Sequence, residues 1–157
     1  MKKTIFINYR SCDEPFAALF IDKRLAEHFG PERVFRDTRT IRPGTHFPTE
    51  IRLALQQCRV LLVVIGARWL RRGPGGRLID RPDDYVRLEI ANGLRRPDVA
   101  VVPVLVDDTP MPAASDLPAD IAELASRQYV RLRFRDADAD ASRLVGELVK
   151  LIGDVGL

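Results

Sequence analysis

The chain has 157 residues, of which 46% are hydrophobic and 30% charged, a balance typical of one globular domain. No apolar run approaches the roughly 20 residues that a membrane span needs, so we expect a cytoplasmic protein without membrane contact. Two cysteines, Cys12 and Cys58, are too few and too far apart for a zinc site or a disulfide framework. We therefore expect no bound metal and no resident cofactor.

Arginine dominates the positive charge, because only four of the 25 basic residues are lysines and the net charge is +3. Five arginines lie between Arg68 and Arg81. Such a loop can attract phosphate groups, but on charge alone a solvated loop is the favoured interpretation. Residues 73–76 (GPGG) lack the spacing of phosphate-binding glycine motifs, which favours a plain loop or a lid. No nucleic-acid-binding signature is present, so no nucleic-acid partner is expected.

Strand and helix patterns alternate through the first half of the chain. A β-rich run at 4–9 precedes a helix that Asp13 is predicted to cap and that Gly30 ends. The apolar positions of that helix are predicted to include Phe16, Leu19, Phe20, Ala26 and Phe29. A short strand at 34–35 leads into a polar loop at 36–46. The next helix is marked by the spacing of Phe47, Ile51, Leu55 and Cys58.

The second half continues the alternation. Residues 60–65 and 99–106 are apolar without a period of two, as in central parallel strands covered on both faces, although Pro103 is unusual there. Between them, residues 83–94 form an amphipathic helix pattern. A short helix at 121–126, an edge strand at 129–134 and a closing helix near 144–152 complete the chain.

Five β-α units predict an α/β fold of the flavodoxin-like, three-layer kind. We expect a five-stranded parallel sheet in the order 2-1-3-4-5 with helices on both faces. The domain is predicted to span residues 1–153, with 154–157 as a tail that could begin a linker. In such folds ligands bind beyond the carboxyl ends of the strands, at the switch point between strands one and three.

The helix at 83–94 carries a possible functional pair. Val86, Ile90 and Gly93 share the stripe that packs on the sheet, while Tyr85 and Glu89 lie beside it, one turn apart. Taken alone, Glu89 is more simply read as a solvated helix acid, since glutamate is seldom buried. Whether it faces a ligand depends on the loops around it.

Several segments together resemble TIR (Toll/interleukin receptor) domains of the bacterial type. Residues 5–10 (IFINYR) are similar to the first conserved box, 35–37 (FRD) with Pro43-Gly44 to the second box and its BB loop, and 63–70 to the third strand. Tyr85-x-x-x-Glu89 resembles the W-x-x-x-E signature of the NAD-cleaving branch. The resemblance covers nearly the whole chain and implies the flavodoxin-like fold expected from the strand pattern.

The resemblance implies an enzyme that cleaves the nicotinamide–ribose bond of NAD+. The products would be nicotinamide and ADP-ribose or a cyclic ADP-ribose isomer, formed by a protein that self-assembly activates in bacterial, anti-phage immune signalling. NAD+ is then the substrate, and other TIR domains are partners through the BB loop, Arg36 to Phe47. The alternative is a non-enzymatic TIR adaptor. A phosphoacceptor receiver fits less well, because Ile65-Gly66 stands where a receiver needs an Asp. A flavin binder also fits less well, because residues 10–14 are not a phosphate loop rich in Ser, Thr and Gly.

The resemblance also implies roles for particular residues. Glu89 would be catalytic. Substrate binding would fall to Tyr9, Arg10, Ser11, Asp37, Phe47 and Tyr85. Two of these differ from the usual pattern, because Tyr85 replaces a Trp and Ser11 stands where some members carry a second arginine. Tyr9 and Phe47 could equally be core residues, and Asp37 a turn residue.

Overall fold

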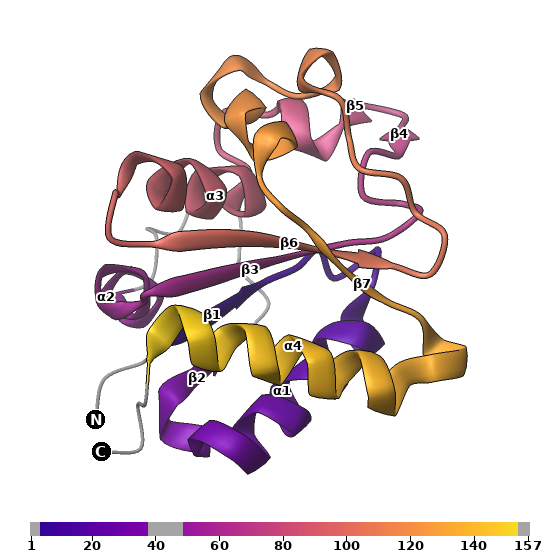
Figure 1. Cartoon of the computed structure of the whole chain (residues 1–157). Coiled ribbons are helices and arrows are strands. Elements are labelled where there is room, and N and C mark those ends of the chain that lie inside the picture. The colour runs from indigo at the N-terminus through magenta and orange to yellow at the C-terminus, as the bar shows by residue number, and fades with distance from the viewer. Residues whose placement is uncertain (1–3, 38–48, 154–157) are drawn as a thin grey trace.

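The computed structural model describes residues 4–37 and 49–153, and these form a three-layer α/β domain (Figure 1). A five-stranded parallel sheet has the order β2-β1-β3-β6-β7, which is the predicted order 2-1-3-4-5. Its strands are β1 (Ile5–Asn8), β2 (Val34–Arg36), β3 (Val60–Ile65), β6 (Ala100–Val106) and β7 (Val130–Leu132). The flavodoxin-like topology predicted from the sequence is confirmed.

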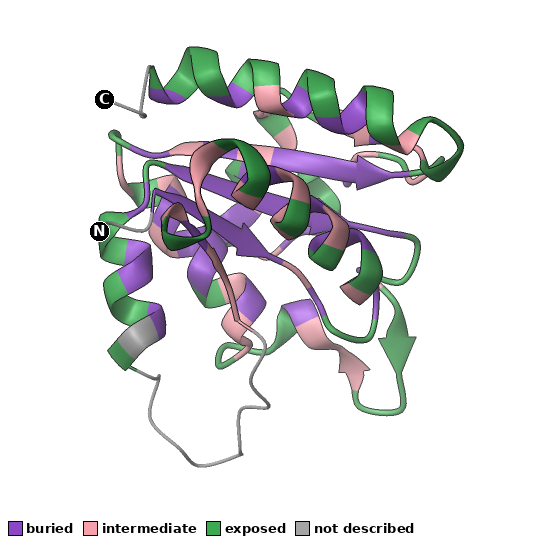
Figure 2. Ribbon diagram, turned by 90° about the horizontal axis from the view of Figure 1, so that it is seen from below, coloured by how far each residue is buried: buried purple, intermediate pink, exposed green. Residues whose placement is uncertain are grey.

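Helices cover both faces of the sheet. Two of them, α1 (Pro15–Phe29) and α4 (Ala137–Ile152), pack on one face, and α2 (Thr49–Gln57) and α3 (Tyr85–Arg95) pack on the other. Figure 2 shows the buried strands between helices whose outer sides are exposed. Short 3₁₀ turns connect these elements: η1 (Pro31–Arg33), η2 (Leu78–Asp80), η3 (Ala114–Asp116), η4 (Ala119–Ser126) and η5 (Phe134–Asp136). The short helix predicted at 121–126 is thus the 3₁₀ segment η4.

Pro103 lies inside the central strand β6, where a missing N–H is normally costly. The N–H of Ala100 points toward β3, because it donates to the carbonyl of Arg59. Hydrogen-bonding directions alternate along a strand, so the nitrogen of Pro103 points to the opposite side. Pairing with β7 begins only at Val104, so no ladder bond is lost.

Two predictions for α1 are wrong. The helix buries Ala17, Ala18, Ile21 and Leu25, whereas Phe16, expected in the apolar stripe, is 77% exposed. The small side chains of Ala17 and Ala18 face the sheet, which lets the helix backbone pack close to the strands. Asp13 does not cap α1: the N-cap position is Glu14, without a side-chain cap, and Pro15 begins the helix.

Asp13 instead joins the loop after β1 to the loop after β3. Its carboxylate is buried and accepts hydrogen bonds from the backbone N–H groups of Gly66, at 2.7 Å, and Arg68, at 2.8 Å. The guanidinium of Arg68 returns a bond to the carbonyl of Asp13, at 2.9 Å. These bonds hold together two of the loops that border the switch point of the sheet.

Helix α3 lies close to the sheet because Gly93 faces it. A Cβ atom added at Gly93 would lie 2.7 Å from Cδ2 of Leu61 and 3.3 Å from Cγ2 of Val101. Glycine at this position lets the helix backbone approach β3 and β6. The close approach in turn fixes the direction of Glu89, one turn earlier along the helix.

The charged loop between β3 and α3 is an ordered hairpin rather than an irregular loop. Its strands are β4 (Arg72–Gly73) and β5 (Gly76–Arg77), and Gly76 has a φ of +92°, which residues other than glycine rarely adopt.

In the described ranges, no helix is long and apolar enough to span a membrane.

Replacing Asp13 by alanine should lower the free energy of unfolding by about 2–4 kcal/mol, because two buried N–H groups lose a charged acceptor. The matched control is Asp138→Ala, since the Asp138 side chain is 94% exposed although it pairs with Arg24. That change should cost less than about 1 kcal/mol. Urea unfolding measures both values, and equal losses would show that the loop connection is not stabilising.

Candidate active site

The candidate site lies where β1 ends against helix α3. Asn8, the last residue of β1, is fully buried, and its side-chain amide donates to Oε1 of Glu89 at 2.7 Å and to the carbonyl of Val86 at 3.2 Å. Sequence reasoning gave Asn8 no role. The available signal was a polar residue that directly continues the apolar run Ile5–Ile7 at the carboxyl end of a central strand.

Glu89 is buried, with 6% of its surface exposed. Burial raises its pKa to about 8, the hydrogen bond from Asn8 opposes that rise, and the nearby carboxylates of Asp37 and Asp84 add to it. Its Oε2 makes no hydrogen bond to the residues that the structure describes. Glu89 is therefore a mostly protonated acid at neutral pH with one oxygen available to a ligand, and not the solvated helix acid that its residue type favours.

Arg10 is buried and bound by Asp84. Two parallel hydrogen bonds, at 2.8 and 3.0 Å, join its guanidinium to the Asp84 carboxylate. Asp84 also caps α3, because it accepts from the backbone N–H of Arg87. Arg10 thus fixes the start of the helix that carries Tyr85 and Glu89. A phosphate contact by this residue, expected from the family pattern, stays a prediction.

The remaining predicted residues surround this cluster to different extents. Tyr9 is partly buried, and its hydroxyl donates to the backbone carbonyl of Asp37 at 2.7 Å, which joins the ends of β1 and β2. Tyr85 is half-buried at the start of α3, and Ser11 is exposed in the turn after β1. Phe47 and most of the BB loop lie outside the described residues. The roles of Tyr9, Ser11, Asp37, Phe47 and Tyr85 in substrate binding stay predictions.

The cysteines behave as two different groups. Cys58 is buried in the core, as predicted; its Sγ donates to the carbonyl of Leu55, and burial raises its pKa to about 11. Cys12 is exposed in the loop after β1. Within residues 4–37 and 49–153, no group of three or more His, Cys, Asp or Glu side chains is placed to hold a metal ion.

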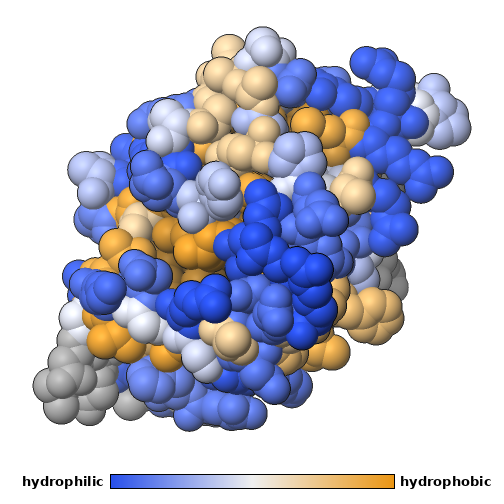
Figure 3. Space-filling model, turned by 45° about the vertical axis from the view of Figure 1, so that its right-hand side comes forward, coloured by the Kyte–Doolittle hydropathy of each residue, from blue (hydrophilic) through white to orange (hydrophobic). Residues whose placement is uncertain are grey.

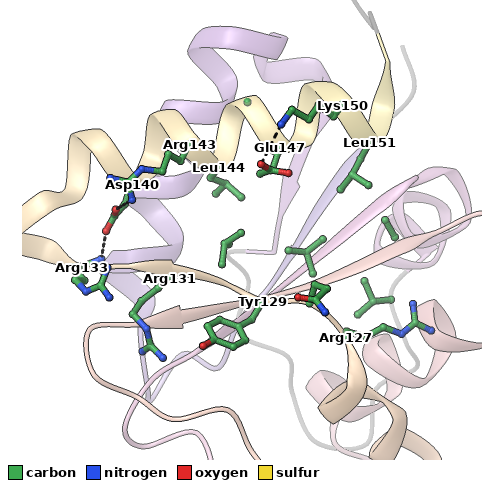
Figure 4. A pocket seen from close by; sticks show the side chains of 16 residues that line it. Arg127, Tyr129, Arg131, Arg133, Asp140, Arg143, Leu144, Glu147, Lys150 and Leu151 are labelled. Carbon is green, nitrogen blue, oxygen red and sulfur yellow. Dashed lines mark hydrogen bonds and ion pairs between the residues drawn. The ribbon is translucent and has the colours of Figure 1, made fainter.

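A large hollow lies elsewhere, between β7, the first half of β6 and helix α4. Its volume is about 890 Å³, and Figure 4 shows Tyr129, Leu144 and Leu151 among the side chains around it. Figure 3 shows apolar side chains gathered on one face of the molecule with hydrophilic side chains around them. Two ion pairs lie among the charged residues around it, Arg143 with Asp140 and Lys150 with Glu147. Glu89 does not line it, so size alone does not mark the candidate site.

Comparison with known proteins identifies the family. The family model described as TIR domain matches residues 5–145. The chain belongs to the TIR domain family. Among curated proteins, none matches it significantly.

Two solved structures share the TIR fold. The TIR domains of the activated Roq1 resistosome, which directly recognises the pathogen effector XopQ, are 14% identical, with a TM-score of 0.58 over 96% of this chain and 99% of that one. A metazoan TIR-STING receptor from C. gigas, in complex with 2',3'-cGAMP, is 19% identical, with a TM-score of 0.55 over 90% of this chain. The match covers 39% of the receptor chain, so this TIR domain spans about two fifths of that protein.

Replacing Glu89 by glutamine should stabilise the TIR domain in a pH-dependent way. Between pH 4.5 and about 8 the unfolded chain releases the Glu89 proton while the folded chain keeps it, so the unaltered protein loses stability as pH rises through this window. Glutamine accepts from Asn8 without that loss. The gain should reach about 3–5 kcal/mol at pH 8 and nearly vanish near pH 4.5.

Thermal or urea unfolding at the two pH values measures this difference. The matched control is Glu147→Gln on the exposed side of α4, which should stay within about 0.5 kcal/mol of the unaltered protein at both pH values. A glutamine at position 89 that destabilises the protein equally at both pH values would contradict a buried, protonated Glu89.

Proposed function

We propose that this TIR domain is an NAD+ glycohydrolase that cleaves the nicotinamide–ribose bond, with Glu89 as its catalytic residue. One observation carries the proposal: a buried glutamate with a raised pKa lies at the carboxyl end of strand β1, one turn from an aromatic residue. Titratable groups with strongly shifted pKa values gather at functional sites more often than elsewhere. The match to the TIR family, some of whose members cleave NAD+, points the same way.

The chemistry suits a single carboxyl group. The nicotinamide of NAD+ is already cationic and departs as a neutral base, so its departure needs no general acid, unlike ordinary glycoside hydrolysis. Positive charge develops on the ribose carbon and ring oxygen as the bond breaks. A carboxylate held beside the ribose stabilises that charge electrostatically in a site with little water.

A pKa near 8 also suits Glu89 to the second half of the reaction. When water attacks the ribosyl cation, one proton must leave the water. A glutamate whose pKa lies near the working pH accepts that proton more readily than one with the ordinary value. The products are then nicotinamide, ADP-ribose and one proton. Attack by an atom of the bound ADP-ribosyl part instead gives a cyclic isomer.

Asn8 and Arg10 position this carboxyl group. Asn8 holds one oxygen of Glu89, and Arg10 holds Asp84 at the start of the same helix. Tyr85, one turn before Glu89, provides an aromatic face that could stack on the nicotinamide or ribose. Self-association through Arg36 to Phe47 belongs to the same proposal, and the resistosome assembly of the Roq1 TIR domains supports it.

The alternative is a TIR interaction module without turnover. The observation that favours it is the limited access to the cluster: Glu89 is 6% exposed, and Arg10 is occupied by Asp84. An adaptor would consume no NAD+ even when assembled. It would lose binding to a second TIR domain when Pro43 or Gly44 of the BB loop is replaced.

The decisive assay follows nicotinamide release by the purified domain, concentrated or displayed on a scaffold that brings several copies together. Glu89→Gln should lower the rate at least about 100-fold, because a positioned electrostatic group is lost. The matched control, Glu147→Gln, removes a carboxylate from the exposed side of α4 and should leave the rate unchanged. Equal release by the unaltered protein and Glu89→Gln would refute the assignment.

The pH dependence provides a separate test. If free Glu89 must lose its proton before it can act, kcat/KM should rise about tenfold per pH unit below pH 8 and level off above it. The rise in kcat should lie at lower pH, because the cationic substrate favours the ionised form of the acid beside it. A flat kcat/KM profile between pH 6 and 8.5 would contradict this role of Glu89.

A further inference from the structure

A second cavity lies between the loop after β1, the loop after β3 and the β4–β5 hairpin. Its volume is about 250 Å³, and four arginines line it: Arg10, Arg68, Arg71 and Arg81. Trp69 is also part of its wall, and among the described residues that line it none is acidic. The volume is below the range of about 300–1,000 Å³ typical of sites for whole drug-sized ligands, so the cavity suits a small group.

The positive charge of this cavity is only partly balanced. Arg10 is paired with Asp84, and the Arg68 guanidinium donates to a backbone carbonyl. Neither Arg71 nor Arg81 makes a side-chain hydrogen bond or ion pair with any residue in the described ranges. By contrast, two nearby arginines outside the cavity form ion pairs, Arg77 with Asp80 and Arg87 with Asp120. Arg71 and Arg81 are both exposed, so within the described residues the wall of this cavity has two unpaired guanidinium groups that a ligand can reach.

Two side chains of the cavity wall each have a buried hydrogen-bond donor without an acceptor among the described residues. The Nε of Arg10 and the Nε1 of Trp69 are fully buried and have no hydrogen-bond partner within the described part of the chain. Arg10 is 5% and Trp69 2% exposed. A buried donor without an acceptor costs about 1–3 kcal/mol, and both side chains line this cavity. Both nitrogens are closed off from solvent, so an anion in the cavity would reach them only after the side chains of the wall shift.

The turn of the hairpin lies beside one of the arginines. A Cβ atom added at Gly75 would lie 2.9 Å from Nη2 of Arg81, so the Arg81 guanidinium lies directly against the backbone of the turn. Glycine at this position makes room for it. The glycine-rich stretch thus supports an arginine side chain, although its spacing excludes a backbone phosphate loop.

We propose that this cavity binds a phosphate or diphosphate group. Forked guanidinium donors match phosphate oxygens in pairs, and four arginines and the side chain of Trp69 line a space of suitable size. The group belongs either to a free anion or to a larger ligand, such as a dinucleotide, the rest of which lies outside the cavity. The site does not require Glu89 to be catalytic.

Trp69 gives a direct readout, because it is the only tryptophan in the chain. Sodium pyrophosphate, and ADP-ribose in a parallel arm, would be titrated into the ¹⁵N-labelled domain while the single indole N–H resonance is followed at low salt. We expect a saturable shift of that resonance. Tighter binding of ADP-ribose than of pyrophosphate would identify a nucleotide diphosphate as the ligand, and equal or weaker binding a free anion.

The matched variants separate a built site from general attraction between charges. Arg71→Gln with Arg81→Gln should weaken pyrophosphate binding at least tenfold. The control, Arg52→Gln with Arg95→Gln, removes the same charge from exposed positions on α2 and α3 and should leave the affinity unchanged. Equal weakening in both pairs, no saturable binding, or binding that leaves the indole resonance unmoved would each overturn the proposal.

Glu89→Gln separates this site from the proposed enzymatic function. Pyrophosphate should bind to that variant as tightly as to the unaltered domain, because Glu89 does not line the cavity. Pyrophosphate binding without NAD+ cleavage would support the cavity and refute the enzyme. NAD+ cleavage without pyrophosphate binding would support the enzyme and refute the phosphate site in the cavity.

Discussion

The hydrogen bond from Asn8 to Glu89 joins the end of strand β1 to helix α3, and the candidate site depends on it. It holds a carboxyl group where burial is unfavourable for a charge, so the pKa of Glu89 rises to about 8. Gly93 brings the helix close enough to the sheet for the bond to form. Asp84 and Arg10 fix the start of the same helix. The end of β1, Gly93 and the Arg10–Asp84 ion pair together place Glu89 where it is buried and largely protonated.

The charged groups around the switch point fall into two neighbouring regions of opposite character. Around Glu89, acidic groups predominate, because Asp37 and Asp84 both raise its pKa. On the other side of Arg10, the cavity under the β4–β5 hairpin is lined by arginines. Arg10 belongs to both regions: its guanidinium pairs with Asp84, and its side chain lines the cavity. A ligand with a cationic end and a phosphate-bearing end would match this arrangement.

Most of the fold could be predicted from the sequence, because parallel strands buried on both faces leave a clear apolar pattern. The runs at 60–65 and 99–106 gave the central strands, and the alternation of elements gave the sheet order. The predictions for helix α1 failed because they depended on contacts with distant parts of the chain. Asp13 looks like a helix cap but bonds to a loop 53 residues away, and Phe16 fits an apolar period yet is exposed because alanines face the sheet.

The sequence by itself determined the topology, the TIR resemblance and the choice of Tyr85 and Glu89, because periodicity and motif spacing are local properties. Only the tertiary structure decided that Glu89 is buried and largely protonated, since its pKa depends on Asn8, Asp37 and Asp84 from other parts of the chain. It likewise paired Arg10 with Asp84, 74 residues away, and gave Arg71 and Arg81, near Trp69, no side-chain partner among the residues it describes. Burial and charge pairing arise from contacts between distant segments, which no local pattern records.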